Sequence, residues 1–286
     1  MSVRVITDSV ASIPPDLLAD NDIDVVSLFV NDGECNQAET EMDVADFYRR
    51  LADMTTLPTS SQPSVEALIE AFRGSLDRGH DVLGLFLSRK MSGTFETARM
   101  AAQMVLDEFP EGRVEVLDSG SNSMEEGFGA IAAAHAARAG MAIERCVDAA
   151  TATLRKSRYL FSPHTLEYLR RGGRIGGASA LVGGLLQIKP ILTVEDGETQ
   201  TFSKVRTQRR ALEAMARTCA EDAKAFGLAQ VIVHYIADLE LAEHFAAEQI
   251  EPIAGRPVRV IPVSPVIGLH VGPAVGIVYE TEREFV

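Results

Sequence analysis

The first half of the chain alternates short apolar runs with segments whose apolar residues recur at helical spacing. The apolar, β-branched runs, which are typical of buried strands, lie at residues 3–9, 23–30, 81–88 and 113–119. The predicted helices follow Pro14, span residues 43–51, follow Ser64, follow the loop 88–94 and lie on both sides of Gly140. Strands that alternate with helices in this way predict a parallel sheet with helices on both faces.

The pattern changes in the second half. A helix over residues 165–171 is predicted to stop at Gly172, and a short helix is predicted at 180–188. Asp196-Gly197 lies between two apolar runs, which is the strongest short-range signal for a β-hairpin. The remaining predicted elements are a helix at 207–226, strands at 231–236, 258–263 and 274–280, and a helix that ends at Gln249. This half is predicted to contain a mixed, partly antiparallel sheet.

We therefore predict an α/β protein of two domains. Residues 1–160 form an N-terminal α/β domain with a parallel sheet and Ser/Thr-rich loops, and residues 161–286 form a mixed-sheet α+β domain. A chain of 286 residues exceeds one average domain, which agrees with this division.

Composition and charge narrow the class of protein. Hydrophobic residues make up 46% and charged residues 24%, which excludes a disordered or collagen-like chain. The formal net charge of -14 disfavours binding to nucleic acid and to anionic membrane surfaces. The 3 cysteines form no C-x-x-C pattern, so we expect reduced thiols, no thiolate zinc site and a cytoplasmic location. We find no signal-peptide pattern at the start and no apolar run of the roughly 18 residues that a membrane span needs, so no stable membrane insertion is expected.

Four loops rich in hydroxyl groups and glycine follow predicted strands or lie beside them. They are Thr7-Asp8-Ser9, residues 59–62, residues 88–94 and Asp118-Ser119-Gly120. The carboxyl ends of parallel strands meet at one edge of a sheet, where ligands bind. A loop that leads into a helix, as residues 91–94 do, offers N–H groups and hydroxyls to a carboxylate or a phosphate. Helix capping is the better explanation for any single loop, but it becomes less satisfactory for several loops in one half.

The common catalytic motifs are missing from the sequence. There is no P-loop, no G-x-G-x-x-G after the first strand, no H-E-x-x-H and no G-x-S-x-G. We expect neither a metal nor a cofactor. The glycine-rich residues 172–177 follow a helix rather than a strand, so we interpret them as a turn that presents Arg174.

His270 is the histidine whose setting points to function. It lies between glycines in a predicted loop that joins two strands, which is typical of a side chain presented to a ligand. The other five histidines are interpreted as structural. A basic run at Lys204, Arg206, Arg209 and Arg210 is either a solvated helix start or a docking patch for an anionic partner.

Together these segments resemble the DegV family, the fatty-acid-binding proteins that serve bacterial fatty-acid kinase. The matching segments are ITDS at 6–9, TSSQPS at 59–64, SRKMSGTFETA at 88–98, VLDS at 116–119, LEYLRRGGRIGGASALVGGLLQIKPIL at 166–192, KVRT at 204–207 and SPVIGLHVGP at 264–273. They occur in order and span nearly the whole chain. The long block at 166–192 and the terminal His-x-Gly-Pro are the specific parts of the match.

The resemblance implies that the second domain completes a site for one long-chain fatty acid. An ATP-dependent kinase subunit would phosphorylate the bound carboxylate to an acyl phosphate for phospholipid synthesis. The chain itself would be a lipid-binding, substrate-presenting subunit and not an enzyme. By the same resemblance, the carboxylate would be bound by Ser60, Ser61, Ser92, Gly93 and His270. Arg206 would lie near the kinase or the phosphate.

Two departures from the family pattern concern this site. Ser60 replaces the usual threonine, and Arg89-Lys90 stand where the family more often has small residues, which adds two cations near the anion site. An alternative of a different class is a stand-alone acyl or phosphoryl transferase that uses Ser92 and His270. A third possibility is a sensor that binds another amphiphile.

Overall fold

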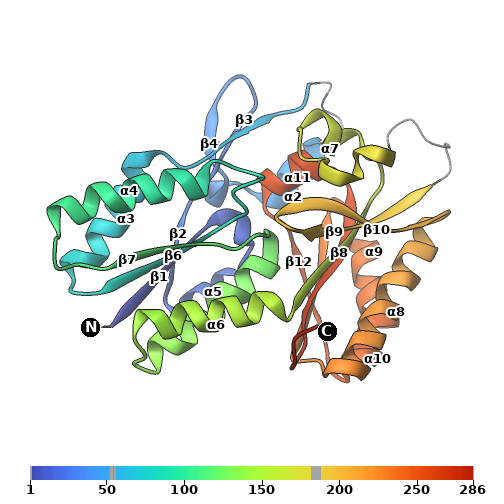
Figure 1. The fold of residues 1–286 in the computed structure, drawn as a ribbon. Coiled ribbons are helices and arrows are strands. Elements are labelled where there is room, and N and C mark those ends of the chain that lie inside the picture. Colours follow the sequence, from blue (N-terminus) through green and yellow to red (C-terminus); the bar gives the residue numbers. More distant parts are fainter. Residues whose placement is uncertain (1, 52–53, 55, 182–187, 286) are drawn as a thin grey trace. The chain divides into compact units, whose positions relative to one another are not determined.

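The structure is a computed structural model, drawn as a ribbon in Figure 1. It describes residues 2–51, 54, 56–181 and 188–285. Among these residues, no helix combines the length and the apolar character needed to cross a membrane.

The chain divides into two compact units, each with a sheet and a hydrophobic core of its own. The first unit contains Met1–Glu41 and Ser60–Leu154, and the second contains Met42–Thr59 and Arg155–Val286. This division differs from the predicted one mainly at residues 42–59, which the prediction placed in the N-terminal domain.

The first unit is built on a four-stranded parallel sheet in the order β2-β1-β6-β7, as predicted. Its strands are β1 (Val3–Asp8), β2 (Ile23–Val26), β6 (Asp81–Phe86) and β7 (Val114–Asp118). Thr7 of β1 lies opposite Leu85 of β6, and Phe86 of β6 lies opposite Asp118 of β7. The carboxyl ends of these three strands therefore meet at one edge of the sheet.

The prediction of a single strand over residues 23–30 is wrong, because this segment forms two strands in different sheets. After β2, the chain enters β3 (Phe29–Asn31), which lies in a three-stranded sheet with β4 (Asn36–Ala38) and β5 (Thr59–Ser61). It leaves the parallel sheet at Leu28, whose N–H donates to the side-chain Oγ of Ser9 at 2.8 Å. Ser27 is the only polar residue after Asp24 in this mostly apolar stretch, so the sequence pattern did not reveal the break.

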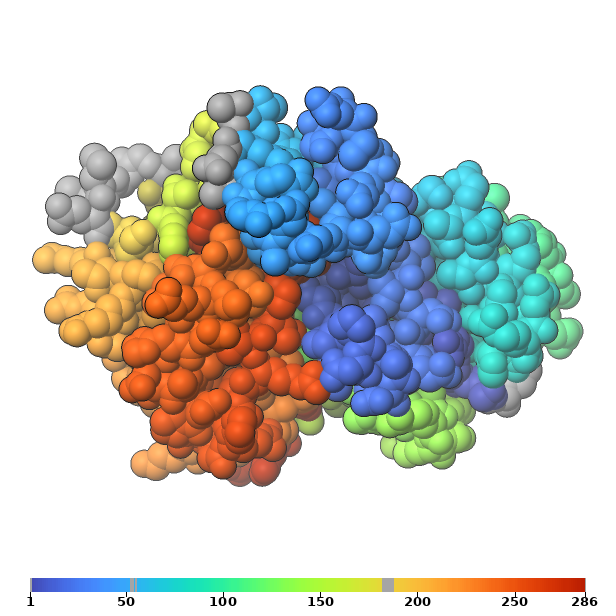
Figure 2. Space-filling view, turned by 180° about the vertical axis from the view of Figure 1, so that it is seen from behind, coloured from blue at the N-terminus to red at the C-terminus, as the bar shows by residue number. Residues whose placement is uncertain are grey.

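Helices cover both faces of the parallel sheet, with α3 and α4 on one face and α5 and α6 on the other (Figure 1). The helical segments of this unit are η1 (Ser9–Ala11), α1 (Pro15–Asn21), η2 (Glu39–Glu41), α3 (Val65–Asp77), α4 (Thr94–Glu108), α5 (Ser123–Arg138) and α6 (Ile143–Arg155). Figure 2 shows α3 and α4 side by side at the surface. Beneath them, Leu68 and Phe72 of α3 and Ala101 of α4 are buried with Phe86 in one core cluster. Ser64 caps α3 as predicted, since its Oγ accepts the Ala67 N–H at 3.1 Å.

The second unit contains a mixed sheet, as predicted, with six strands in the order β10-β9-β8-β13-β11-β12. Its strands are β8 (Ser157–Pro163), β9 (Lys189–Glu195), β10 (Glu198–Val205), β11 (Gln230–Ile236), β12 (Arg259–Pro262) and β13 (Ala274–Glu280). The strand at residues 157–163 was not predicted, and the predicted domain boundary at residue 160 falls within it. The pairing of β11 with β12 is parallel, and the other pairings are antiparallel. The predicted hairpin joins β9 to β10, and Asp196 and Gly197 at its turn have φ angles of 51° and 77°. Two positive φ angles are what a type I′ turn requires.

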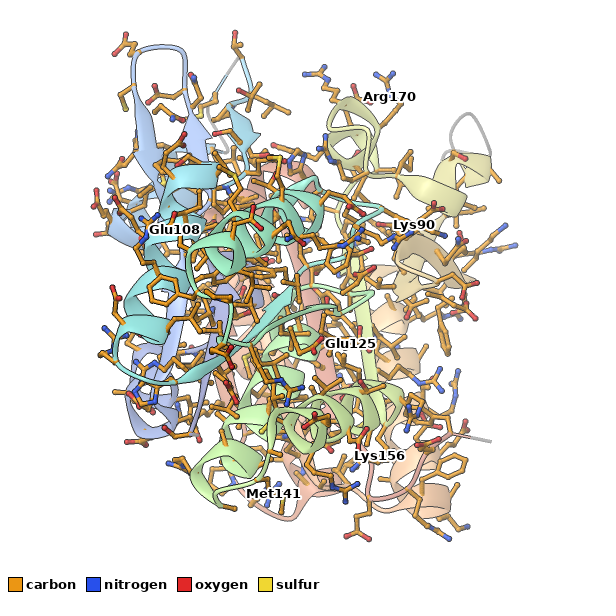
Figure 3. All side chains as sticks on the ribbon, turned by 60° about the vertical axis from the view of Figure 1, so that its left-hand side comes forward. Lys90, Glu108, Glu125, Met141, Lys156 and Arg170 are labelled. Carbon is orange, nitrogen blue, oxygen red and sulfur yellow. The ribbon has the colours of Figure 1, made fainter. Side chains whose placement is uncertain are left out.

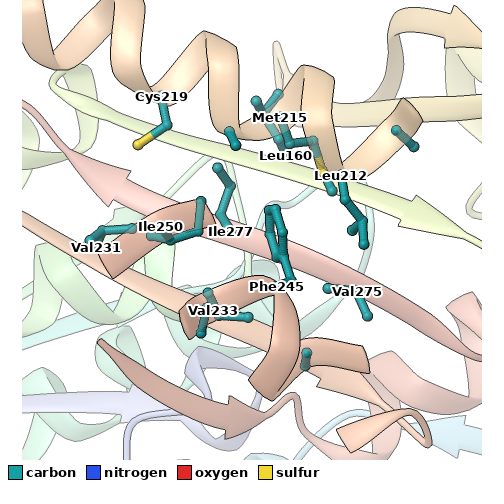
Figure 4. Packing of buried hydrophobic residues seen from close by; sticks show 14 of the residues in the cluster. Leu160, Leu212, Met215, Cys219, Val231, Val233, Phe245, Ile250, Val275 and Ile277 are labelled. Carbon is teal, nitrogen blue, oxygen red and sulfur yellow. The ribbon is translucent and has the colours of Figure 1, made fainter. Parts of the chain in front are cut away.

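One face of this sheet is covered by helices whose buried side chains form the core shown in Figure 4. The helical segments are α2 (Val44–Leu51), α7 (Glu167–Arg171), η3 (Gly176–Leu181), α8 (Gln208–Phe226), α9 (Leu239–Phe245), η4 (Ala246–Ile250), α10 (Glu251–Ala254) and α11 (Pro265–Val271). Leu212 and Met215 of α8 belong to the same cluster as Leu160 and Ile277 of the sheet. Most of the short helix predicted at 180–188 lies outside the described residues.

Helix α2 belongs to the second unit because it packs against α11. The hydroxyl of Tyr48 donates to the carbonyl oxygens of Val263 and Ser264, at 2.7 and 3.0 Å. A Cβ at Gly268 would collide with the ring of Tyr48, so the helix and the aromatic side chain are in close contact. This contact joins residues more than two hundred positions apart.

Candidate functional site

Three of the four predicted polar loops meet at the carboxyl edge of the parallel sheet. Thr7, Asp8 and Ser88 are fully buried there, and the Thr7 hydroxyl donates to Oε1 of the buried Glu126 at 3.1 Å. Burial raises the pKa of Asp8 to about 7. It also raises the pKa of Glu126 well above its ordinary value, and the charge of Asp8 adds to that effect. This edge is therefore a buried, acidic polar layer beneath the loops.

The loop between β6 and α4 contains Ser92 and Gly93 and leads directly into the first turn of α4. Gly93 is the N-cap residue, and Thr94 begins the helix. The Oγ of Ser92 lies 2.9 Å from Oγ1 of Thr94 and accepts the Thr94 N–H at 3.3 Å. Ser92 is half-buried and Gly93 is exposed. Thr94 is fully buried, so Ser92 carries the accessible hydroxyl at the start of this 15-residue helix. A helix N-terminus with a hydroxyl beside it suits an anion, because it carries partial positive charge.

Residues 59–62 reach this loop through the side chain of Gln62. Ser60 and Ser61 belong to β5, so this segment is itself a short strand outside the parallel sheet, unlike the other three polar loops. The Nε2 of Gln62 donates to Oγ1 of Thr97 at 2.5 Å, and its Oε1 occupies the space that a Cβ at Gly93 would need. The four site residues predicted in the first half are thus joined by one glutamine.

His270 does not lie in a loop, as its flanking glycines had suggested, but in the last turn of α11. The helix begins at Ser264, whose Oγ accepts the Ile267 N–H at 3.3 Å, and Pro265 occupies its first position. It ends at Gly272, which has a φ angle of 70°. The Ser-Pro pair is a helix-start signal, and it outweighs the glycines that favoured a loop.

The side chain of His270 packs against the turn that follows α7. Its Nδ1 occupies the space that a Cβ at Gly172 would need. Burial, and to a smaller extent the positive charge of Arg174, lowers the pKa of His270 to about 4, so the ring is neutral near pH 7. The turn lies at Gly172 and Gly173, and Gly176 and Gly177 begin η3, so the predicted turn over residues 172–177 is only partly observed. Arg174 follows this turn and is close enough for its charge to act on His270, which the spacing of the sequence alone did not indicate.

Arg206 is exposed and lies just after β10, before the N-cap of α8. The end of β10 and the start of β13, which follows His270, lie at the same edge of the six-stranded sheet. Three strand spacings of about 4.8 Å separate them, roughly 14 Å in all. Arg206 follows the end of β10 and His270 precedes the start of β13, so both residues belong to the same end of the second unit.

The two cations that depart from the family pattern are exposed in the β6–α4 loop, where Figure 3 labels Lys90. Arg89 lies next to Asp118, with 3.9 Å between Nε and Oδ2, and its guanidinium is 5.9 Å from the ring centre of Phe95. Arg89 is therefore engaged by an acidic and an aromatic neighbour within the first unit.

The predicted site residues are divided between the two units. Ser60, Ser61, Ser92 and Gly93 lie in the first unit, and His270 and Arg206 lie in the second. Sequence reasoning missed Gln62 and Thr97, which hold the loops together, although Gln62 stands within the matched segment TSSQPS.

Comparisons with a family model, with related sequences and with solved structures agree on one family. A family model described as "Uncharacterised protein, DegV family" matches residues 2–282. A DegV domain-containing protein of Clostridium acetobutylicum is 42% identical over 284 residues, which is 99% of each chain. The solved structure of a DegV family protein from Thermus thermophilus, described with fatty acid binding, is 31% identical with a TM-score of 0.86 and covers 98% of this chain and 100% of its own. DegV from Bacillus subtilis, described as a fatty acid binding protein, is also 31% identical with a TM-score of 0.86, at 98% and 99% coverage. The chain belongs to the DegV family.

Proposed function

We propose that this chain binds one long-chain fatty acid and presents its carboxyl group to an ATP-dependent fatty-acid kinase. The observation that carries the proposal is the pair of loops in the first unit, residues 59–62 and 88–94. Gln62 joins them at the start of α4, where Ser92 offers a hydroxyl and Gly93 an N–H group. Two DegV proteins of known structure that are described as binding fatty acids support the fatty-acid-binding part of this role.

The carboxylate would be bound by Ser60, Ser61, Ser92, Gly93 and His270. A carboxylate that leaves water needs hydrogen bonds to replace those it loses, and bonds to a charged acceptor are the strongest kind. The N-terminus of α4 adds a favourable potential for negative charge. Since the ring of His270 is neutral near pH 7, it would donate one N–H to the ligand, and a carboxylate beside it would raise its pKa.

The acyl chain would supply most of the affinity. Burying a methylene group contributes about 0.8 kcal/mol, so a sixteen-carbon chain contributes on the order of 10 kcal/mol before the losses of association. The carboxylate site would then fix which end of the lipid is presented.

The kinase subunit would bring ATP and phosphorylate the bound carboxylate to an acyl phosphate, which would enter phospholipid synthesis in the cytoplasm. In this division of work the chain needs no cofactor and no metal. Arg206, exposed at the edge of the second sheet, would contact the kinase or the phosphate.

Native mass spectrometry of the protein as purified tests the ligand. We expect a mass increment of one fatty acid, which is lost on delipidation and regained on incubation with a long-chain fatty acid. An increment that matches another amphiphile would favour the sensor interpretation instead.

Ser92→Ala tests the carboxylate site. Loss of a hydrogen bond to a charged group costs roughly 1.5–3 kcal/mol, so affinity in a fluorescent-lipid titration should fall by about ten- to a hundredfold. Ser64→Ala is the matched control, because it removes a hydroxyl that caps a helix in the same unit but lies outside the proposed site. Equal affinities of the two variants would contradict the assignment.

Incubation of the pure protein with ATP and fatty acid separates this function from the transferase alternative. The hydroxyl of Ser92 is paired with that of Thr94, which is not a base, so the geometry does not favour a nucleophilic serine. We expect acyl phosphate only after a cognate kinase is added. Turnover without the kinase would establish the transferase.

A further inference from the structure

Two strands of the parallel sheet, β1 and β7, end at the sequence Asp-Ser. They flank β6, which leads into the loop that carries Ser92 and Gly93. Asp8 ends β1 and Asp118 ends β7, and β6 lies between these strands in the sheet. The register places Phe86, the last residue of β6, opposite Asp118. The chain then continues through residues 87–93 to the start of α4.

Asp8 holds the first residue of this loop. Its Oδ2 accepts the Leu87 N–H at 2.9 Å, and its Oδ1 accepts the Val10 N–H at the same distance. One fully buried carboxylate thus joins the turn after β1 to the loop after β6. Because both oxygens are used, an asparagine at this position would keep only one of the two acceptors.

Asp118 and its neighbours hold the next two residues from the other side. The Oδ1 of Asp118 accepts the Arg89 N–H at 3.3 Å and the Gly120 N–H at 2.9 Å. Between these contacts, the Ser88 N–H donates to the carbonyl oxygen of Ser121 at 2.8 Å. Three consecutive N–H groups of the loop are therefore bound by groups from the two neighbouring strand ends.

We propose that Asp8 and Asp118 are positioning residues for the fatty-acid carboxylate, acting through the loop that carries Ser92 and Gly93. This inference rests on the proposed function, since it concerns the same site. The two carboxylates touch no ligand themselves. They hold the backbone of residues 87–89, so that the loop enters α4 with its hydroxyl and N–H groups in a fixed direction.

The cost of burying Asp8 supports this role. A carboxylate in the interior is unfavourable unless it is well hydrogen-bonded, and here Glu39 adds negative charge nearby. An apolar residue would fill the same place at lower cost, but it would leave the Leu87 N–H without its acceptor. The acidic residue therefore serves the geometry of the loop and not the stability of the sheet.

The test measures fatty-acid affinity by fluorescent-lipid titration in Asp8→Asn and Asp118→Ala, each with and without Ser92→Ala. Alanine is used at position 118 because a single oxygen of Asp118 accepts both N–H groups, and asparagine would keep it. In the otherwise native chain, we expect Asp8→Asn to weaken binding roughly tenfold. In the Ser92→Ala background, the same change should weaken binding less than about twofold, because residues that act through one contact are not additive. Asp32→Asn is the matched control: Asp32 also accepts two backbone N–H groups, in the exposed β3–β4 turn, and its replacement should leave affinity unchanged.

Amide hydrogen exchange gives a second readout that general destabilisation would not reproduce. We expect faster exchange at residues 87–89 in both aspartate variants, with unchanged exchange in α3. If Asp8→Asn fails to fold, the partly exposed Asp118 still tests the inference through its own variant.

Three results would overturn the inference or what it rests on. If Ser92→Ala weakens binding and both aspartate variants bind like the native chain, this inference is wrong and the proposed function stands. Fully additive losses with Ser92→Ala would likewise make the aspartates merely structural. If Ser92→Ala itself has no effect, the carboxylate site is wrong, and this inference falls with it.

Discussion

At positions 93 and 172, a neighbouring side chain fills the space that a Cβ atom would occupy. Glycine is favoured there for this reason and not for its backbone conformation. Gly93 and Gly172 have φ angles of -75° and -72°, which any residue adopts. At each position a Cβ would collide with a polar side chain, Gln62 in the first unit and His270 in the second. Each glycine therefore allows a neighbouring polar side chain to lie directly on the backbone.

Gly172→Ala should displace His270 and destabilise the second unit. Overpacking of this kind costs about 1–3 kcal/mol, and His270→Ala in the same chain should relieve most of it. Urea unfolding of the single and double variants measures both effects. Gly74→Ala in α3 is the control, because its nearest neighbour would be 3.8 Å away, so alanine should stabilise that helix by about 0.5–1 kcal/mol. A double variant no more stable than Gly172→Ala would show that His270 does not occupy that space.

Asp8 should make the stability of the protein fall as pH rises. Burial raises its pKa from 3.8 to about 7, and the negative charge of Glu39 opposes its ionisation further. The folded state therefore holds a proton that the unfolded state releases, so the stabilisation is complete below about pH 3.8 and is lost as pH rises through 7. The change corresponds to on the order of 4 kcal/mol.

The measurement compares the free energy of unfolding of the native chain with that of Asp8→Asn from pH 4 to pH 8. Relative to the variant, the native chain should lose stability across this range. Asp32→Asn provides a control of opposite sign, since hydrogen bonds from Cys35 and Glu34 lower the pKa of Asp32. A difference between the native chain and Asp8→Asn that does not vary with pH would contradict the assignment.

Among the helices, α8 begins with charges that oppose its own dipole. It has no acidic residue in its first turn, while Arg209 and Arg210 stand there and Arg206 precedes the N-cap Thr207. Cations near a helix N-terminus are unfavourable by a few tenths of a kcal/mol each. Arg209 offsets part of this cost through its i,i+4 ion pair with Glu213, so within the proposed function the anionic partner concerns Arg206.

Arg206→Ala should impair kinase-dependent phosphorylation and leave fatty-acid affinity nearly unchanged. Charges at the rim of an interface act mainly on association and on its salt dependence, so the defect should shrink at high salt. Arg217→Ala, on an exposed face of the same helix, is the control. Equal losses in binding and phosphorylation would move Arg206 into the lipid site, and no loss in either would make it a solvated residue.

Across the whole molecule, the chain passes between the two units more than once. Residues 42–59 interrupt the first unit and pack in the second, where Tyr48 of α2 is hydrogen-bonded to the start of α11. Ser60 and Ser61 follow immediately, so the segment that carries them is attached to the second unit on one side and to the first on the other.

Fatty acid should stabilise the folded protein by mass action. A ligand that binds only the folded state contributes about 2.7 kcal/mol at one hundred times its dissociation constant, which raises the melting temperature by several degrees in a chain of this size. Differential scanning of the delipidated protein with and without palmitate measures the shift. Acetate is the control, because it offers the carboxylate without the apolar chain. An equal shift with acetate would show that no acyl chain is buried.

The sequence by itself determined most elements and the fold class. Helical spacing and β-branched runs depend on neighbouring residues, so they predicted the parallel sheet, the mixed sheet, the cap at Ser64 and the turn at Asp196-Gly197. Motifs in order along the chain also indicated the family. At His270 two local signals conflicted. The prediction followed the flanking glycines and placed a loop there, whereas the structure follows the Ser-Pro helix start and has a helix.

Only the tertiary structure decided which distant residues meet. The contact of Tyr48 with Val263, the packing of Gln62 on Gly93 and that of His270 on Gly172 leave no periodic trace in the chain. The hydrogen bond from the Leu87 N–H to Asp8 also could not be predicted from the sequence, although the sequence Asp-Ser at the ends of two predicted strands could be read from it. These contacts depend on the order of the strands in a sheet and on the packing of the loops at its end. The spacing of residues that are neighbours in sequence determines neither.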